Sequence, residues 1–196
     1  MLFTLPNGNL ALGGYSTNTY SPVFIFNPYD GSLIYNLTGH TSTIWSLAAF
    51  PNGNLASGTY GSDYSIIVWN LKDGTILSKL TGHSGSIDAL LVLPDGSLAS
   101  GSRDKTIKIW NPNNGALRYT STGHAADVRV LKLLPGGYLA SGSFDKTIKT
   151  WDSYNEYKLK QTLSTSFNSG PINFLIVLSD GKIASSNSGG YIHIWA

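Results

Sequence analysis

Short runs of apolar residues, each ended by a polar turn, follow one another along the chain. Examples are IDALLVL (87–93), SLASGS (97–102) and TIKIW (106–110), which are rich in β-branched, aromatic and small residues. No stretch keeps the apolar period of about 3.6 residues that a long helix would need, and glycine and proline recur too often for such helices. The pattern therefore predicts an essentially all-β chain of short strands.

The strand pattern returns at a nearly constant interval. Trp69, Trp110, Trp151 and Trp195 are separated by 41, 41 and 44 residues, and the segment LASGSRDKTIKIWNPNNG (98–115) recurs almost unchanged at 139–156. Each interval has room for four strands, and turn signals such as PNGN and PDGS fall at the same place in each. We predict five repeats, the first and last incomplete, at approximately 1–38, 39–80, 81–121, 122–165 and 166–196.

Three Gly-His pairs keep the same phase as the tryptophans, at 39–40, 82–83 and 123–124. A repeat of this length, with Gly-His near its start and Trp near the end of its third strand, resembles the WD-repeat (WD40) β-propeller family. The resemblance extends over the whole chain and implies one domain, residues 1–196, built of four-stranded antiparallel blades, about five of them present. The chain departs from the family pattern in that only Trp151-Asp152 keeps the literal Trp-Asp pair.

Aligned on the tryptophans, each central repeat places an aspartate six residues before the Trp and a serine ten residues before it, or twelve in the second repeat. In the WD40 family these side chains and the histidine form a buried hydrogen-bonded brace, which the resemblance implies here, because buried polar groups must be paired. The implied braces are His40, Ser57, Asp63 and Trp69; His83, Ser100, Asp104 and Trp110; and His124, Ser141, Asp145 and Trp151. The outer repeats depart from the pattern: the first has Leu12, Tyr20 and Phe26, and the last has Asn168 and Gly189 beside Ser185 and Trp195.

Serine, histidine and aspartate together also suggest a nucleophilic triad. A nucleophile needs an exposed, activated site beside an oxyanion hole, whereas this set occurs in three copies in closely similar repeats. The sequence contains no glycine-rich phosphate loop, paired carboxylate site or metal-ligand spacing. We therefore expect no enzyme activity, no catalytic residue, no cofactor and no metal.

The repeats diverge at the loops that precede the first strand and follow the second strand. Three and five residues after each histidine lie the upper-face contact positions of the family, and the residue before each turn aspartate is Ser62, Arg103 or Phe144. From these positions we predict partner contacts by Trp45, Asp88, Arg103, Asp127, Arg129 and Phe144, which include the residue types that dominate interface energetics. Two alternatives stay open: Trp45 packs between blades, and the two arginines are plain solvated charges.

Composition narrows the choice of partner. Charged residues make up 12% of the chain and the net charge is +2, so neither an acidic tail nor a basic nucleic-acid surface is present in the composition. Lys105, Lys108, Lys146 and Lys149 recur in two repeats only, which favours a solvated strand face over a phosphate-binding stripe. The chain has no cysteine, and its amino terminus lacks a signal-peptide pattern. We expect a cytoplasmic protein that binds a protein or peptide, not nucleic acid or a membrane.

The repeat count predicts four nearly complete blades and three strands of a fifth. Because WD-repeat propellers usually have seven blades, we expect a partial propeller, or an open arc that associates with another copy through its blade edges. A closed ring of five blades, strained or gapped at its seam, stays open as an alternative. The leading interpretation is a non-catalytic interaction scaffold that binds a peptide or protein on the propeller rim. The alternative is the sensor or substrate-recruiting portion of a larger multidomain signalling protein or ubiquitin-ligase receptor.

Overall fold

The computed structural model describes residues 1–15, 20–164 and 170–195. Its strands form five antiparallel sheets, four of four strands and one of three. The first contains β1 (Leu2–Thr4), β2 (Leu10–Gly13), β3 (Ser21–Phe26) and β4 (Leu33–His40); the second β5 (Thr43–Ala49), β6 (Leu55–Tyr60), β7 (Ile66–Asn70) and β8 (Thr75–Leu80); the third β9 (Ile87–Val92), β10 (Leu98–Ser102), β11 (Ile107–Trp110) and β12 (Leu117–Ser121); the fourth β13 (Val128–Leu133), β14 (Leu139–Ser143), β15 (Thr147–Asp152) and β16 (Lys158–Ser164); and the fifth β17 (Ile172–Val177), β18 (Ile183–Asn187) and β19 (Ile192–Trp195). Within the described residues the only helix is one 3₁₀ turn, η1 (Pro135–Gly137), which confirms the all-β prediction.

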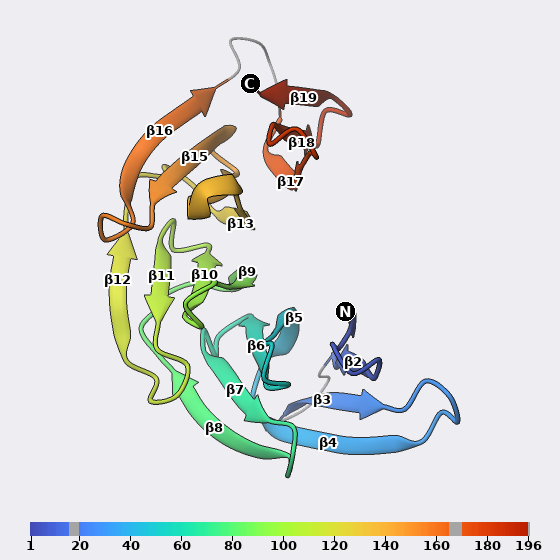
Figure 1. The fold of residues 1–196 in the computed structure, drawn as a ribbon. Coiled ribbons are helices and arrows are strands. Elements are labelled where there is room, and N and C mark those ends of the chain that lie inside the picture. Colours follow the sequence, from blue (N-terminus) through green and yellow to red (C-terminus); the bar gives the residue numbers. More distant parts are fainter. Residues whose placement is uncertain (16–19, 165–169, 196) are drawn as a thin grey trace.

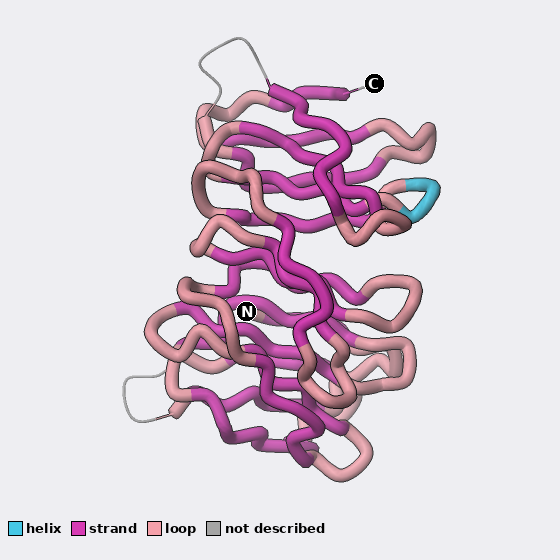
Figure 2. Tube along the Cα trace, turned by 90° about the vertical axis from the view of Figure 1, so that its left-hand side faces the viewer, coloured by secondary structure: helices cyan, strands magenta, loops and turns pink. Residues whose placement is uncertain are grey.

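Each sheet is a meander in which consecutive strands pair. The sheets fan around an arc, with β5, β9, β13 and β17 on its inner side and β8, β12 and β16 on its outer side (Figure 1). Inner strands of neighbouring sheets pack against one another, and the view at 90° shows the sheets as successive layers (Figure 2). The sheets are therefore the blades of a β-propeller, as predicted.

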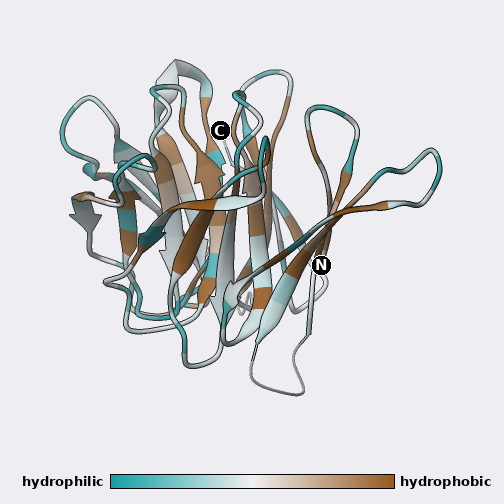
Figure 3. Cartoon of the chain, turned by 90° about the horizontal axis from the view of Figure 1, so that it is seen from below, coloured by the Kyte–Doolittle hydropathy of each residue, from teal (hydrophilic) through white to brown (hydrophobic). Residues whose placement is uncertain are grey.

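The core lies between blades, where apolar strand residues from two sheets meet. One such cluster joins Leu37 and Ile25 of the first blade to Leu55 and Trp69 of the second. Brown apolar segments fall within the strands, whereas the loops at the blade ends are mainly hydrophilic (Figure 3). Each blade is thus held by its neighbours, as expected of a repeat protein whose units cannot bury their own faces.

Close packing between blades depends on one glycine in the second strand of each of the first four blades. A Cβ built on Gly101 would lie 2.8 Å from Val128, on the first strand of the next blade, and a Cβ on Gly142 would lie 2.6 Å from Ile172. These separations are well inside carbon–carbon van der Waals contact. The recurring Leu-Ala-Ser-Gly-Ser segment therefore has a residue without a side chain at the point where the next blade packs against it. The fifth blade has Ser186 at the equivalent position.

The arc is not closed, because no described strand of the first sheet pairs with a strand of the last. The outward face of the fifth blade exposes Phe174, Ile176, Ile192 and Ile194. The residues equivalent to Ile192 in the second, third and fourth blades are all fully buried: Ile66, Ile107 and Ile148. The open arc agrees with the predicted partial propeller. No helix in the described ranges is long and apolar enough to cross a membrane.

Candidate functional site

A buried polar brace holds the third blade. His83 lies in the loop before β9, Ser100 on β10, Asp104 in the turn that follows, and Trp110 on β11. Trp110 Nε1 donates to Ser100 Oγ at 2.8 Å, and Ser100 Oγ lies 2.7 Å from His83 Nε2. The other ring nitrogen, His83 Nδ1, lies 2.6 Å from Asp104 Oδ2. The four residues that the family resemblance implied therefore meet in one chain of hydrogen bonds.

A neutral His83 satisfies every member of this chain. The indole N–H only donates and the carboxylate only accepts, so the Ser100 hydroxyl accepts from Trp110 and donates to His83 Nε2, while Nδ1–H donates to Asp104. Burial lowers the pKa of His83, which favours this uncharged form. Burial by itself would raise the pKa of Asp104, but hydrogen bonds from His83, Thr106 and the Ser84 backbone N–H hold that pKa well below its usual range.

The same arrangement occurs in the second and fourth blades. In the second, Ser57 Oγ lies 2.7 Å from Trp69 Nε1 and 2.8 Å from His40 Nε2, and Asp63 Oδ2 lies 3.0 Å from His40 Nδ1. In the fourth, Ser141 Oγ lies 2.8 Å from Trp151 Nε1 and 2.7 Å from His124 Nε2, and Asp145 Oδ2 lies 2.8 Å from His124 Nδ1. Because His40 ends β4 of the first sheet, its brace also ties two neighbouring blades together.

The outer blades keep little of this network. In the fifth, Trp195 Nε1 still donates to Ser185 Oγ at 2.9 Å, whereas Asn168 lies outside the described residues. In the first, the serine and tryptophan positions are held by Leu12 and Phe26, which lack those donors and acceptors. Among the described residues, the first and last blades therefore keep one hydrogen bond of the brace, from Trp195 to Ser185.

The geometry of the brace is unsuited to nucleophilic catalysis. Ser57, Ser100 and Ser141 are fully buried, and each hydroxyl is already engaged by an indole and an imidazole. A catalytic serine must reach a substrate carbonyl beside an oxyanion hole. The three Ser-His-Asp sets resemble a triad in composition, but their hydroxyls face the protein interior.

A second cluster lies at one end of the second, third and fourth blades, where first strands begin and second strands end. It contains Trp45 near the start of β5, Tyr60 at the end of β6, Asp88 on β9, Arg103 after β10, Asp127 and Arg129 around the start of β13, and Phe144 after β14. The six residues predicted as partner contacts therefore lie in one cluster, which we call the arginine–aromatic surface, with the Asp88 side chain beneath it. Tyr60 completes it.

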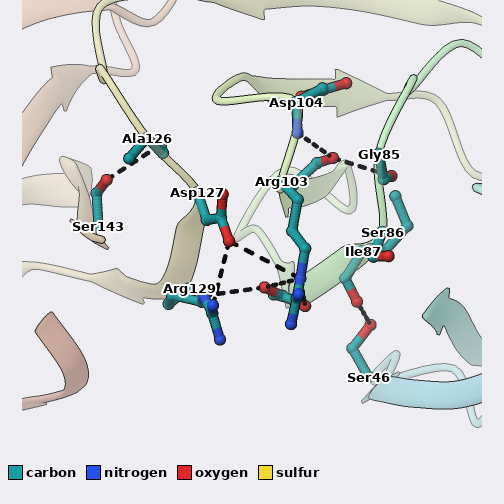
Figure 4. Close-up of polar contacts among 12 residues, drawn as sticks. Ser46, Gly85, Ser86, Ile87, Arg103, Asp104, Ala126, Asp127, Arg129 and Ser143 are labelled. Carbon is teal, nitrogen blue, oxygen red and sulfur yellow. Dashed lines mark hydrogen bonds and ion pairs between the residues drawn. The ribbon is translucent and has the colours of Figure 1, made fainter. Parts of the chain in front are cut away.

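Two arginines share one carboxylate at the centre of this surface. Arg103 Nε donates to both carboxylate oxygens of Asp88, at 3.2 and 3.0 Å, and Arg129 Nε lies 3.2 Å from Asp88 Oδ2. Arg129 Nη2 also donates to Asp127 Oδ2 at 3.1 Å (Figure 4). The Arg103 and Arg129 side chains are 28% and 24% exposed, so neither is the freely solvated charge that the sequence left open.

Asp88 corrects one sequence expectation, because its side chain is only 1% exposed. The Asp88 side chain lies beneath the arginines, so it offers a partner almost no accessible surface. Burial raises the pKa of Asp88, although the positive charges of Arg103 and Arg129 act in the opposite direction. Its role in the geometry is to fix two guanidinium groups.

Aromatic rings flank the arginine pair on both sides. The Arg103 guanidinium carbon lies 4.4 Å from the centre of the Tyr60 ring, and that of Arg129 lies 5.1 Å from the centre of the Phe144 ring. Trp45 packs beside Tyr60, with 5.4 Å between ring centres, and is 49% exposed; Phe144 is 48% exposed. Trp45 therefore packs within the surface while half of it stays open to solvent.

Tyr60 was missed by counting residues back from the tryptophan, which gave Ser62. The second repeat has two extra residues between the end of β6 and Trp69, so counting forward from the start of the strand is the better guide: Tyr60, Arg103 and Phe144 each follow the strand's first leucine by five positions. The structure bears this out, because Tyr60 pairs with Thr43 at the end of the blade where Trp45 lies, and the Tyr60 ring packs beside the Trp45 ring.

Hydrogen bonds inside the loops hold this surface in place. Ser143 Oγ donates to the Ala126 carbonyl oxygen at 3.1 Å, beside Asp127, and Ser102 Oγ donates to the Gly85 carbonyl oxygen at 3.0 Å (Figure 4). The backbone N–H of Arg103 donates to Ser86 O, and that of Phe144 donates to Asp127 O. The side chains are therefore presented from well-fixed backbone.

A family model described as WD domain, G-beta repeat matches residues 31–70, 74–111 and 115–152, which together are more than half of the chain. The chain belongs to the WD40 repeat family. Among solved structures, the crystal structure of the WD40 beta propeller domain of Doa1 matches with a TM-score of 0.75 and 21% sequence identity, over 100% of this chain and 79% of that chain. A comparison with curated proteins gave no match.

WD40 propellers are domains generally used for protein–protein interaction, and they are typically non-catalytic scaffolds. In this WD40 chain the repeated lysines are not a uniform stripe: Lys149 is buried and donates to Thr162 Oγ1 at 2.8 Å, whereas Lys108 donates to Thr120 Oγ1 at 3.1 Å. Across the described residues, no group of three or more histidine, aspartate or glutamate side chains is placed to hold a metal ion.

Proposed function

We propose that this WD40 chain is a non-catalytic interaction scaffold that binds a peptide or protein partner on its rim, through the arginine–aromatic surface. The observation that carries the proposal is the pair of half-exposed aromatic side chains, Trp45 and Phe144, at the two ends of an ion-paired arginine cluster spanning three blades.

The physical basis is the low cost of ordering this surface on binding. Tryptophan, tyrosine and arginine are the residue types most often found at energetic centres of interfaces. Here the arginines are already fixed by Asp88 and by the rings beside them, so little side-chain entropy remains to be lost. A partner that covers the surface would bury large aromatic area on a rigid base.

Selection from a display library of random 12-residue linear peptides tests the proposal. We expect wild-type protein to enrich peptides that lose affinity about ten-fold or more when Trp45→Ala and Phe144→Ala are combined, as truncation of central interface aromatics does. The matched control is Tyr29→Ala with Tyr154→Ala, which removes two exposed aromatics from loops elsewhere. Equal binding by wild type and the Trp45/Phe144 variant, or no enrichment at all, would overturn the proposal.

A further inference from the structure

The arginine pair keeps unused hydrogen-bond donors. A guanidinium has five N–H donors, and among the described residues the Arg103 guanidinium donates only its Nε–H, to Asp88. Within the described ranges, Nη1 and Nη2 of Arg103 have no hydrogen-bond partner, and Nη1 of Arg129 has none either. The two guanidinium groups extend side by side in one direction, that of Arg103 from the turn after β10 and that of Arg129 from β13 (Figure 4). Adjacent, part-exposed donors of this kind match the oxygen atoms of a planar or tetrahedral anion.

The charges of the cluster limit how many anionic groups fit. Asp88 and Asp127 offset the charges of Arg103 and Arg129, so the cluster is close to neutral as a whole. A polyanion such as a nucleic-acid backbone requires an excess of positive charge along its path. A single acidic group, bound by directional hydrogen bonds to the free N–H donors, needs no such excess.

The flanking rings define what lies beside that group. Trp45 and Tyr60 lie on the Arg103 side, and Phe144 lies on the Arg129 side. An acidic residue that contacts both guanidinium groups would place its sequence neighbours against aromatic surface on either side. Apolar neighbours gain most from that environment.

We propose that the arginine–aromatic surface recognises a peptide in which one acidic side chain, carboxylate or phosphoryl, is flanked by apolar residues, with the acidic group bound by Arg103 and Arg129. This inference rests on the proposed function and names the partner chemistry for the same surface. Asp88 is a positioning residue in it, because it orients both guanidinium groups without reaching the partner.

The test uses the peptides that wild-type protein selects from the random 12-residue library. We expect one acidic position between apolar residues, and a loss of about ten-fold or more in affinity when that residue is changed from Glu to Gln, because the guanidinium groups then donate to a neutral amide oxygen instead of a carboxylate. A third peptide carrying phosphoserine at the position separates the two sources of the anion: tighter binding than Glu assigns the site to phosphoryl groups, and weaker binding assigns it to carboxylates.

Variants of the protein test whether the acidic group of the peptide binds to the arginines. Arg103→Lys keeps the positive charge near Asp88 but removes the planar fork, so the Glu peptide should bind more weakly and the Gln peptide should be nearly unaffected. Arg118→Lys, on the exposed Arg118 that pairs with Asp95, is the matched control and should change neither. Thermal melts of both variants show whether the fold is retained.

The outcomes separate the two proposals. Peptides that need Trp45 and Phe144 but carry no acidic position, or that bind equally with Glu and Gln, overturn the acidic-group inference and leave the binding surface standing. Peptides insensitive to Trp45 and Phe144, or no selected peptide, overturn the proposed function and this inference with it.

Discussion

At the residue scale, the serine hydroxyl of each brace is the hydrogen-bond partner of two buried groups, an indole and an imidazole. Ser100 Oγ accepts the indole N–H of Trp110 and donates to His83 Nε2. Removing it leaves a buried donor and a buried acceptor without a partner, whereas the methyl group of alanine adds nothing in exchange.

We predict that Ser100→Ala lowers the free energy of unfolding by about 1–3 kcal/mol, the usual cost of unpaired buried polar groups. Urea denaturation followed by tryptophan fluorescence measures it. Ser185→Ala is the matched control: among the described residues Ser185 Oγ accepts from Trp195 Nε1 and has no second side-chain partner, in a blade whose outer face is open, so its loss should be smaller. Equal losses for the two variants would count against a brace that works as a connected network.

The residue scale also shows where sequence reasoning succeeded and where it stopped. The brace residues could be predicted, because the repeat resembles the WD40 family and that resemblance implied which polar side chains pair. Tyr60 could not be found by that spacing, because a two-residue insertion shifts it. The burial of Asp88 was missed for a different reason: position in the repeat indicates the rim, but only the packing of Arg103 and Arg129 over the carboxylate reveals which side chain lies beneath.

At the element scale, the first strand of each following blade packs directly against the second strand of the blade before it. Gly142 lies where Ile172 packs, and any side chain there would overlap it. The sequence predicted the strand and its turn from the alternating pattern, but not this close approach, since a strand glycine can equally mark a bulge or a bend.

We predict that Gly142→Val destabilises the protein by about 1–3 kcal/mol, because overpacking forces strand β17 away from β14. Thermal unfolding followed by circular dichroism measures the change. Ser186→Val, at the same position in the fifth blade, should cost little, because no following blade packs on that face among the described residues. Tolerance of valine at both positions would show that the blades are not packed as closely as described.

At the scale of the whole molecule, the pKa values of the three brace aspartates are shifted in the same direction. Burial would raise the pKa of Asp63, Asp104 and Asp145, but hydrogen bonds, chiefly from the histidines, hold each pKa well below the ordinary value of 3.8. Each folded carboxyl therefore binds its proton less readily than the unfolded one, and its stabilisation is complete only above the unfolded pKa. The lowered pKa of His83 acts in the same sense from about 6.5 downward, whereas the raised pKa of Asp88 opposes it.

We predict that stability falls steeply as the pH drops through about 4, since three lowered pKa values outweigh one raised value. Urea midpoints measured between pH 7 and pH 3 test this. Asp145→Asn removes one of the three groups and should flatten the pH dependence while lowering stability at pH 7. Urea midpoints that stay constant over this range would contradict the assigned hydrogen bonds.

The near-identity of segments 98–115 and 139–156 makes the corresponding stretches of the gene suited to recombination with each other. A genetic exchange between them that removes residues 98–138 joins β9 directly to the segment that begins β14. The shortened chain would still press Ile87 against Gly58 and Ile172 against Gly142, as the full chain does. One recombination event can therefore remove a blade, or in the reverse direction add one, while these two contacts between blades are kept.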